Sequence, residues 1–135
     1  MQKIYSENEK GLLLHCVVRK AEIVGRQNLI ADNEFLQVST LGLEAEDTFN
    51  AHIHLWKDVD FTQYLAQESW VVISGEIEVS FFDTDGKLLE IVVLREGDSS
   101  ITLHGGHSYR AVKKSLVYEF KSGPYRGVNS DKKQI

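Results

Sequence analysis

Apolar and polar side chains alternate with a period of two along much of this sequence. In residues 35–43, for example, Leu36 and Val38 fall on one side, and Gln37 and Ser39 fall on the other. Side chains alternate across a β-strand in this way, whereas no ten-residue stretch has the 3.6-residue apolar period of an amphipathic helix. We therefore expect an all-β protein with one short helix at most.

Turn residues divide the apolar runs into short strands. The strands are expected in residues 12–24, 35–43, 49–56, 69–82, 88–94, 100–103, 109–112 and 116–120. Gly75 is expected to break residues 69–82 into a hairpin pair, because glycine lacks a Cβ. Asp85-Gly86 is the usual signal for a hairpin turn, and Lys113-Lys114 is expected to turn a last hairpin. Many short strands with frequent turns indicate an antiparallel sandwich or barrel.

The apolar positions of these runs predict a core and a partner. The expected core comprises Leu14, Leu36, Val38, Leu43, Ile53, Val72, Ile77, Val79, Phe81, Val92, Ile101, Leu116 and Phe120. Two runs, Leu12-Leu13-Leu14 and Ile91-Val92-Val93, are apolar on both faces, so both sides of these strands need cover. A second subunit can supply that cover at an edge strand, and we expect a homodimer.

Three short stretches carry the candidate chemistry. His52 and His54 share one face of a strand, because residues two apart project from the same side. Glu68 opens a second strand with apolar neighbours, and a carboxylate on such a face costs several kcal/mol if it has no partner. His107 follows two glycines at the start of a later strand. Imidazole and carboxylate groups brought together by strand pairing form a ligand set for a divalent metal.

These stretches resemble the two motifs of the cupin family. His52-Ile53-His54, then Glu68 and, after six residues, Gly75 is similar to the first motif, and Gly97-Asp98 followed by His107 is similar to the second. The resemblance covers roughly residues 35–121. Two features depart from the common pattern: a long gap between His54 and Glu68, and Leu103 where proline is frequent.

A subgroup of small cupins offers a further likeness. Its members have a long gap of this kind, a Gln-Glu pair before the strand (Gln67-Glu68 in this chain), Gly-Gly-His (Gly105-Gly106-His107), and a late Gly-Pro-Tyr (Gly123-Pro124-Tyr125). The resemblance implies a double-stranded β-helix, a jelly-roll barrel of two antiparallel sheets. It also implies that His52, His54, Glu68 and His107 bind one divalent transition metal. Iron, manganese, zinc, nickel and cobalt all suit such nitrogen and oxygen ligands, and the sequence does not choose among them.

For each of the other polar and aromatic candidates, the sequence allows two interpretations. His104 competes with His107 as the last ligand, and is otherwise expected to act with Tyr109 as a catalytic acid or base. His15 is read as a solvated or core histidine, with Cys16 on the opposite face of its strand. Trp56, Trp70, Tyr109 and Tyr118 are expected either to line a pocket or to pack in the core, and Lys121 and Tyr125 either to close one end of the barrel or to form a terminal turn.

Length and charge limit the class of protein. The 135 residues fit one domain, with residues 1–10 flexible or reaching a second subunit and residues 122–135 forming a tail. The net charge of −5 and the absence of long basic runs argue against nucleic-acid binding. The single cysteine, together with the lack of a leader or a membrane-spanning apolar stretch, predicts a soluble cytoplasmic protein.

Three functions remain open at this point. The first is a small metalloenzyme, of dioxygenase, isomerase or lyase type, acting on a small polar metabolite such as a carbohydrate or carboxylate. The second is a non-catalytic module that binds a ligand or the metal itself and acts as a sensor. The third is a metal-free sugar-nucleotide isomerase or epimerase of cupin type with a histidine base and a tyrosine acid. The fold does not decide among them, because one fold hosts many functions.

Overall fold

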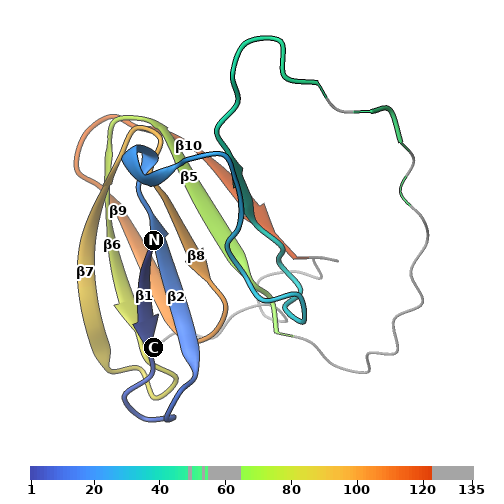
Figure 1. The fold of residues 1–135 in the computed structure, drawn as a ribbon. Coiled ribbons are helices and arrows are strands. Elements are labelled where there is room, and N and C mark those ends of the chain that lie inside the picture. Colours follow the sequence, from blue (N-terminus) through green and yellow to red (C-terminus); the bar gives the residue numbers. More distant parts are fainter. Residues whose placement is uncertain (49, 53, 55–64, 123–135) are drawn as a thin grey trace.

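The computed structural model describes residues 1–48, 50–52, 54 and 65–122, and most of its strands lie in two antiparallel sheets that face each other (Figure 1). The larger sheet has the order β1-β2-β8-β5-β10, formed by Gln2–Tyr5, Leu13–Val18, Ser99–Thr102, Glu68–Ser74 and Leu116–Lys121. The smaller sheet has the order β7-β6-β9, formed by Leu88–Arg95, Glu76–Phe82 and Gly106–Ala111.

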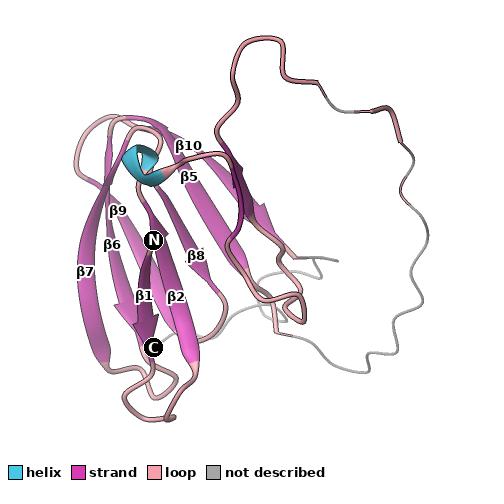
Figure 2. Cartoon of the chain, in the orientation of Figure 1, coloured by secondary structure: helices cyan, strands magenta, loops and turns pink. Residues whose placement is uncertain are grey.

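A short hairpin forms a two-stranded sheet of its own. It pairs β3 (Arg26–Asn28) with β4 (Ser39–Leu41), and a single 3-10 turn, η1 (Lys20–Glu22), precedes it. Figure 2 shows that every other element in the described part of the chain is a strand. The expectation of an all-β protein built from antiparallel sheets is therefore confirmed.

Two apolar clusters hold the sheets in place. The inner cluster lies between the two sheets and contains Ile4, Val17, Val72, Ile77, Val79, Phe81, Val92 and Leu94. The outer cluster lies on the other face of β2 and β8, where Leu36 and Val38 cover Cys16 and Ile101. Both faces of β2 are thus buried within one chain, so this strand gives no argument for a second subunit.

The two expected hairpins at Gly75 and at Lys113-Lys114 are wrong. β5 pairs with β8 and β10, whereas β6 pairs with β7 and β9, so the chain crosses from one sheet to the other at Gly75. Gly75 has a φ of +91°, and a Cβ there would lie 2.3 Å from Ser115 Oγ, at the second crossing. Local alternation does not reveal a crossing, because strands that pair and strands that face each other alternate alike. The turn at Asp85-Gly86 does join a paired hairpin, β6–β7.

Several expected core positions are exposed. Leu116 and Phe120 are 58% and 55% exposed, because β10 lies at the edge of its sheet with its outer face uncovered. Leu43 is 55% exposed and lies after β4, outside any strand. Leu14, Val72, Ile77, Val79, Phe81, Val92 and Ile101 are buried as expected, and Ile53 lies outside the described residues.

Two segments differ from the expected strands. Asn50, Ala51, His52 and His54, the described part of residues 49–56, form no strand, and the chain after Gly42 leads away from the sheets (Figure 1, green). Residues 1–10, expected to be flexible or to reach a second subunit, instead contribute β1, which pairs with β2. Hydrogen bonds from Ser6, Glu7 and Asn8 to Asp83 also hold this N-terminal segment to its own chain.

Candidate functional site

Glu68 and His107 meet between the two sheets. Glu68 opens β5, and it shares that strand's inner face with Trp70 and Val72, because alternate residues project to one side. His107 lies on β9, opposite Phe81 of β6. The imidazole Nε2 is 3.2 Å from Glu68 Oε1, and Glu68 is 8% exposed. The structure thus brings together two of the four expected metal ligands.

The Glu68 carboxylate has two further partners. The indole N–H of Trp70 donates to Oε1 at 2.9 Å, and Lys121 Nζ lies 3.9 Å from Oε2. Burial raises the pKa of Glu68, but the contacts with His107, Trp70 and Lys121 outweigh it and hold this pKa below its ordinary value. Glu68 is therefore an ionised carboxylate surrounded by donors at neutral pH.

Aromatic rings form one wall beside this carboxylate. The rings of Trp70 and Tyr109 are stacked with centroids 3.9 Å apart and an interplanar angle of 7°. The Tyr109 hydroxyl is 3.2 Å from Ser100 Oγ, and burial raises the pKa of this phenol. The hydroxyl is thus held by β8, and the pair is part of the packing between the sheets as well as a neighbour of His107, whose ring centroid is 5.1 Å from that of Tyr109.

His107 has one nitrogen without a partner. Its Nδ1 is buried and makes no hydrogen bond among the described residues. Such a group is costly in a protein interior, so it marks a place where a ligand can supply the missing contact.

The glycine corner before His107 fixes where β9 begins. Gly105 has a φ of +74°, and a Cβ there would lie 2.4 Å from the Phe82 carbonyl oxygen and 3.2 Å from His15 Nε2. His15 is fully buried; its Nδ1 is 3.1 Å from Thr102 Oγ1 and its Nε2 is 3.1 Å from the Phe82 carbonyl. His15 is therefore a core histidine, which is one of the two alternatives predicted for it. Its ring packs against the turn at Gly105.

His104 faces a different set of residues. Its Nε2 lies 3.9 Å from Glu34 Oε1, and Glu34 Oε2 accepts a hydrogen bond of 2.5 Å from the side chain of Gln67. Gln67 is 1% exposed, and its Oε1 accepts from the Leu36 amide at 2.7 Å. Glu34 and the structural role of Gln67 were not predicted, because Glu34 lies in an irregular polar stretch with no periodic signal.

His52 and His54 form a pair of their own. Both are exposed, their ring centroids are 5.0 Å apart, and His52 Nδ1 lies 3.0 Å from the carbonyl oxygen of Asn50. Over residues 1–48, 50–52, 54 and 65–122, no three His, Cys, Asp or Glu side chains are grouped to hold a metal ion. The structure therefore places the expected ligands as two pairs, and the four-ligand site stays a prediction.

The remaining expected pocket residues divide in the same way. Tyr118 is 60% exposed on the outer face of β10, so it neither packs in the core nor faces the Glu68–His107 pair. Trp56 and Tyr125 lie outside the described residues.

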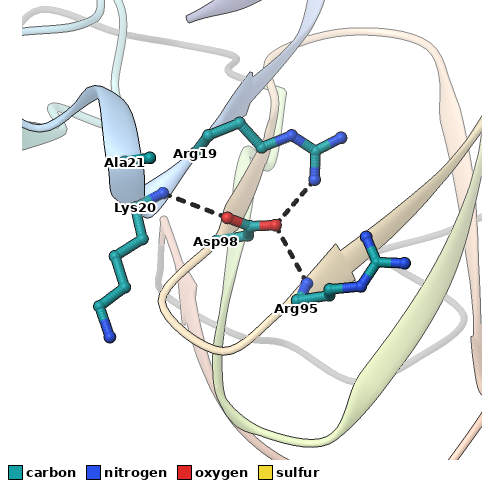
Figure 3. Close-up of a pocket in the computed structure, with 5 residues that line it drawn as sticks. All are labelled: Arg19, Lys20, Ala21, Arg95 and Asp98. Atoms are coloured by element: carbon teal, nitrogen blue, oxygen red, sulfur yellow. Dashed lines mark hydrogen bonds and ion pairs between the residues drawn. The ribbon is translucent and has the colours of Figure 1, made fainter.

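A separate hollow of about 650 Å³ lies where η1 meets the turn between β7 and β8 (Figure 3). Asp98 lies in its lining and accepts hydrogen bonds from the Arg19 side chain (Nη1) at 2.7 Å and from the backbone amides of Lys20 and Arg95 at 3.1 Å each, while the side chains of Lys20 and Arg95 extend away from it (Figure 3). Burial raises the pKa of Asp98, but these donors outweigh it and lower the pKa. Asp98 thus joins three segments, and the hollow follows from that junction.

Comparisons with known proteins identify no relative. Neither the scan against protein-family models nor the searches of curated proteins and of solved structures found a match. Within the described residues, no helix has the length and apolar character needed to cross a membrane.

Proposed function

We propose that this chain is a cupin-type jelly-roll protein that binds one divalent transition metal through His52, His54, Glu68 and His107. At that metal it would take a small polar metabolite, such as a carbohydrate or carboxylate. The observation that carries the proposal is the 3.2 Å separation of Glu68 Oε1 and His107 Nε2. Two ligands bound to one metal at about 2.1 Å, with an angle of about 90–109°, lie about 3.0–3.4 Å apart.

The strand order supports the cupin-type fold. From β5 to β10 the chain changes sheet at every connection except the β6–β7 hairpin, and a jelly roll is a double sheet of this kind. β9 pairs with β6 on one side and, among the described residues, with no strand on the other. A strand carrying His52 and His54 at that edge would bring both imidazoles beside His107.

The surrounding residues fit a metal ligand set. Trp70 donates to the Glu68 carboxylate, as outer hydrogen bonds orient metal-bound carboxylates in general. A bound metal would polarise a substrate oxygen or lower the pKa of a water molecule, and Lys121 would attract an anionic ligand. The predicted acid–base roles of His104 and Tyr109 are not needed for this binding.

A second candidate is metal-free acid–base chemistry of isomerase or epimerase type. It is favoured by the tautomer that the contacts imply: if His107 donates from Nε2 to Glu68, its unpartnered Nδ1 carries a lone pair. A carboxylate that orients an imidazole in this way prepares it to act as a general base.

Metal content separates the two candidates. Protein purified without a metal-affinity step is equilibrated with Zn²⁺, dialysed and analysed for bound zinc. We expect near-stoichiometric zinc in the wild type, and at least about tenfold weaker binding in Glu68→Gln, His54→Ala and His107→Ala. Glu96→Gln is the matched control, because Glu96 is 66% exposed in the β7–β8 turn.

Three outcomes contradict the metal proposal in different ways. Full zinc in the double variant His52→Ala, His54→Ala excludes the His pair as ligands. If His107→Ala binds full zinc while His104→Ala loses it, the last ligand is His104 and not His107. No zinc in the wild type, with iron, manganese, cobalt and nickel also unbound, favours the metal-free candidate. His15 is unsuitable as a control because it is buried and hydrogen-bonded on both nitrogens.

A further inference from the structure

The edge strand β10 exposes an apolar stripe. Leu116, Tyr118 and Phe120 project from its outer face and are 58%, 60% and 55% exposed. β10 pairs with β5 on one side, and within the described residues no strand pairs with its other side. An apolar edge strand with open hydrogen-bonding groups is a ready template for one more strand.

Residues 35–43 have the sequence of a longer strand than the one they form. Their alternation runs the length of the segment, but only Ser39–Leu41 are in a strand, paired with the equally short β3. Thr40 Oγ1 is buried there without a hydrogen-bond partner. Leu41 and Leu43 are 41% and 55% exposed. Val38 packs on the outer cluster and its carbonyl accepts from the Leu29 amide, but the part of the segment after it leaves the Thr40 hydroxyl and two leucine side chains without cover or partner among the described residues.

The start of this segment is fixed beside the end of β10. The Leu36 amide donates to Gln67 Oε1 at 2.7 Å. The Gln67 amide in turn donates to Ser122 Oγ at 2.9 Å, and the Ser122 amide donates to the Gln67 carbonyl at 3.0 Å. Ser122 directly follows β10, so a chain leaving Leu36 can run back along the free edge, antiparallel to β10.

We infer that residues 37–43 add to β10 as a sixth strand of the larger sheet. In doing so they exchange their short pairing with β3, and the contacts of Val38 with Leu29 and the outer cluster, for a longer pairing. With Leu36 level with Ser122, Val38 lies opposite Phe120 and Thr40 lies opposite Tyr118. The added strand satisfies the free edge of β10 and shields its apolar stripe. Thr40 leaves the site where its hydroxyl has no partner.

This arrangement also bears on the candidate site. β9 and β10 are joined by residues 112–115, and their paired neighbours β5 and β6 are joined at Gly75. The free edges of β9 and β10 therefore lie on the same side of the molecule. A sixth strand on β10 carries the chain that follows it, including His52, toward the free edge of β9 and His107. The inference itself concerns the sheet and does not require the metal.

Disulfide trapping tests the pairing. Directly opposite residues of an antiparallel pair have Cα atoms about 4.5–5.5 Å apart, within the range that a disulfide spans. We expect the double variants Thr40→Cys, Tyr118→Cys and Val38→Cys, Phe120→Cys to form an intrachain disulfide under mild oxidation, seen by peptide mapping of the monomer band on a non-reducing gel. The matched control is Thr40→Cys, Ile91→Cys, because Ile91 is 53% exposed on β7 of the other sheet.

The two pairs keep the test decisive if one variant folds poorly, which circular dichroism reports. An intrachain disulfide in either pair, with none in the control, supports the sixth strand. Absence of the disulfide in both folded variants overturns it, and so does a yield equal to that of the control. A disulfide only between chains also overturns it, because the strand on β10 then belongs to a second copy. Since no metal is added, this result is independent of the zinc measurement.

Discussion

Ser6 Oγ donates a hydrogen bond of 2.6 Å to Asp83 Oδ1, although the two residues are 77 positions apart. The same carboxylate accepts from the amides of Glu7 and Asn8 at 2.8 and 3.2 Å and from that of Thr84 at 2.7 Å. Asp83 therefore ties the loop between β1 and β2 to the β6–β7 turn. From the sequence alone, Asp83 is predicted only as a turn residue.

Acid should remove the contribution of Asp83 to stability. Burial raises the pKa of this carboxyl, but the donors from Ser6, Thr84, Glu7 and Asn8 outweigh it and lower the pKa from 3.8 to about 2. A pKa lower in the folded than in the unfolded chain stabilises the fold above pH 3.8, and this stabilisation is lost as the pH falls toward 2.

Urea unfolding of the wild type and of Asp83→Asn across pH 2–6 measures this effect. We expect Asp83→Asn to be less stable near pH 6, because an amide nitrogen replaces one acceptor oxygen, and the difference to shrink toward pH 2. A difference that stays constant over this range would show that the carboxylate charge is not what matters.

His15 should produce a second, separate pH dependence. Burial lowers the pKa of this imidazole, the hydrogen bond with the Phe82 carbonyl raises it, and the net effect takes it from 6.5 to about 4. The folded chain then binds fewer protons than the unfolded chain between pH 4 and 6.5. Stability is greatest above pH 6.5 and falls as the pH drops through this window, by on the order of 3 kcal/mol.

NMR and denaturation together test the role of His15. Its Cε1 proton should not titrate above about pH 5, while the stability of His15→Gln should change less between pH 6.5 and 4 than that of the wild type. Titration of His15 near its ordinary value of 6.5 would contradict its burial as a neutral group.

Period-two alternation was sufficient to predict the class of fold. It identified the strands around Val72, Val79 and Val92 and their burial, because a side chain's face follows from its position in the strand. It did not identify partners: the chain crosses between sheets at Gly75, and sequence spacing does not distinguish a crossing from a hairpin. Leu116 and Phe120 were misplaced because an edge strand with one open face has the same alternation as a covered one.

The candidate site was predictable in part for a related reason. The cost of burying the Glu68 carboxylate demanded donors, and His107 is one of them. Trp70 lies two residues further along the same strand, so alternation alone places it on the face of Glu68. Lys121, like His107, comes from another strand, and its position depends on strand pairing, which sequence does not supply. The position of His52 and His54 relative to Glu68 depends on long-range pairing, so it could not be obtained from the spacing within their own segment.

A methyl group at Gly105 should disrupt the corner that sets the start of β9. Its Cβ would lie 2.4 Å from the Phe82 carbonyl oxygen, in addition to the strain of a φ of +74°. Gly11→Ala is the matched control, because Gly11 has a φ of +84° with no atom within 4 Å of an added Cβ. We expect the control to lose about 1–2 kcal/mol in the free energy of unfolding and Gly105→Ala to lose about 1–3 kcal/mol more. Equal losses of stability in the two variants would mean that the Phe82 carbonyl moves away from the added methyl group at no cost in free energy.

Trp70→Phe should raise the pKa of Glu68. Phenylalanine keeps a ring against Tyr109 but removes the indole N–H that donates to Glu68 Oε1 at 2.9 Å, and donors to the ionised form lower a carboxyl pKa. Tyr109→Phe is the control: it also keeps the stacked rings and loses only the contact with Ser100, so it should leave the pKa of Glu68 nearly unchanged. Carbon-detected NMR of the side-chain carboxyl measures both titrations. If the two variants shift the pKa of Glu68 equally, packing rather than the indole hydrogen bond controls it. If only Trp70→Phe shifts it upward, the indole holds the carboxylate ionised next to His107, as either a metal ligand or a partner in acid–base chemistry requires.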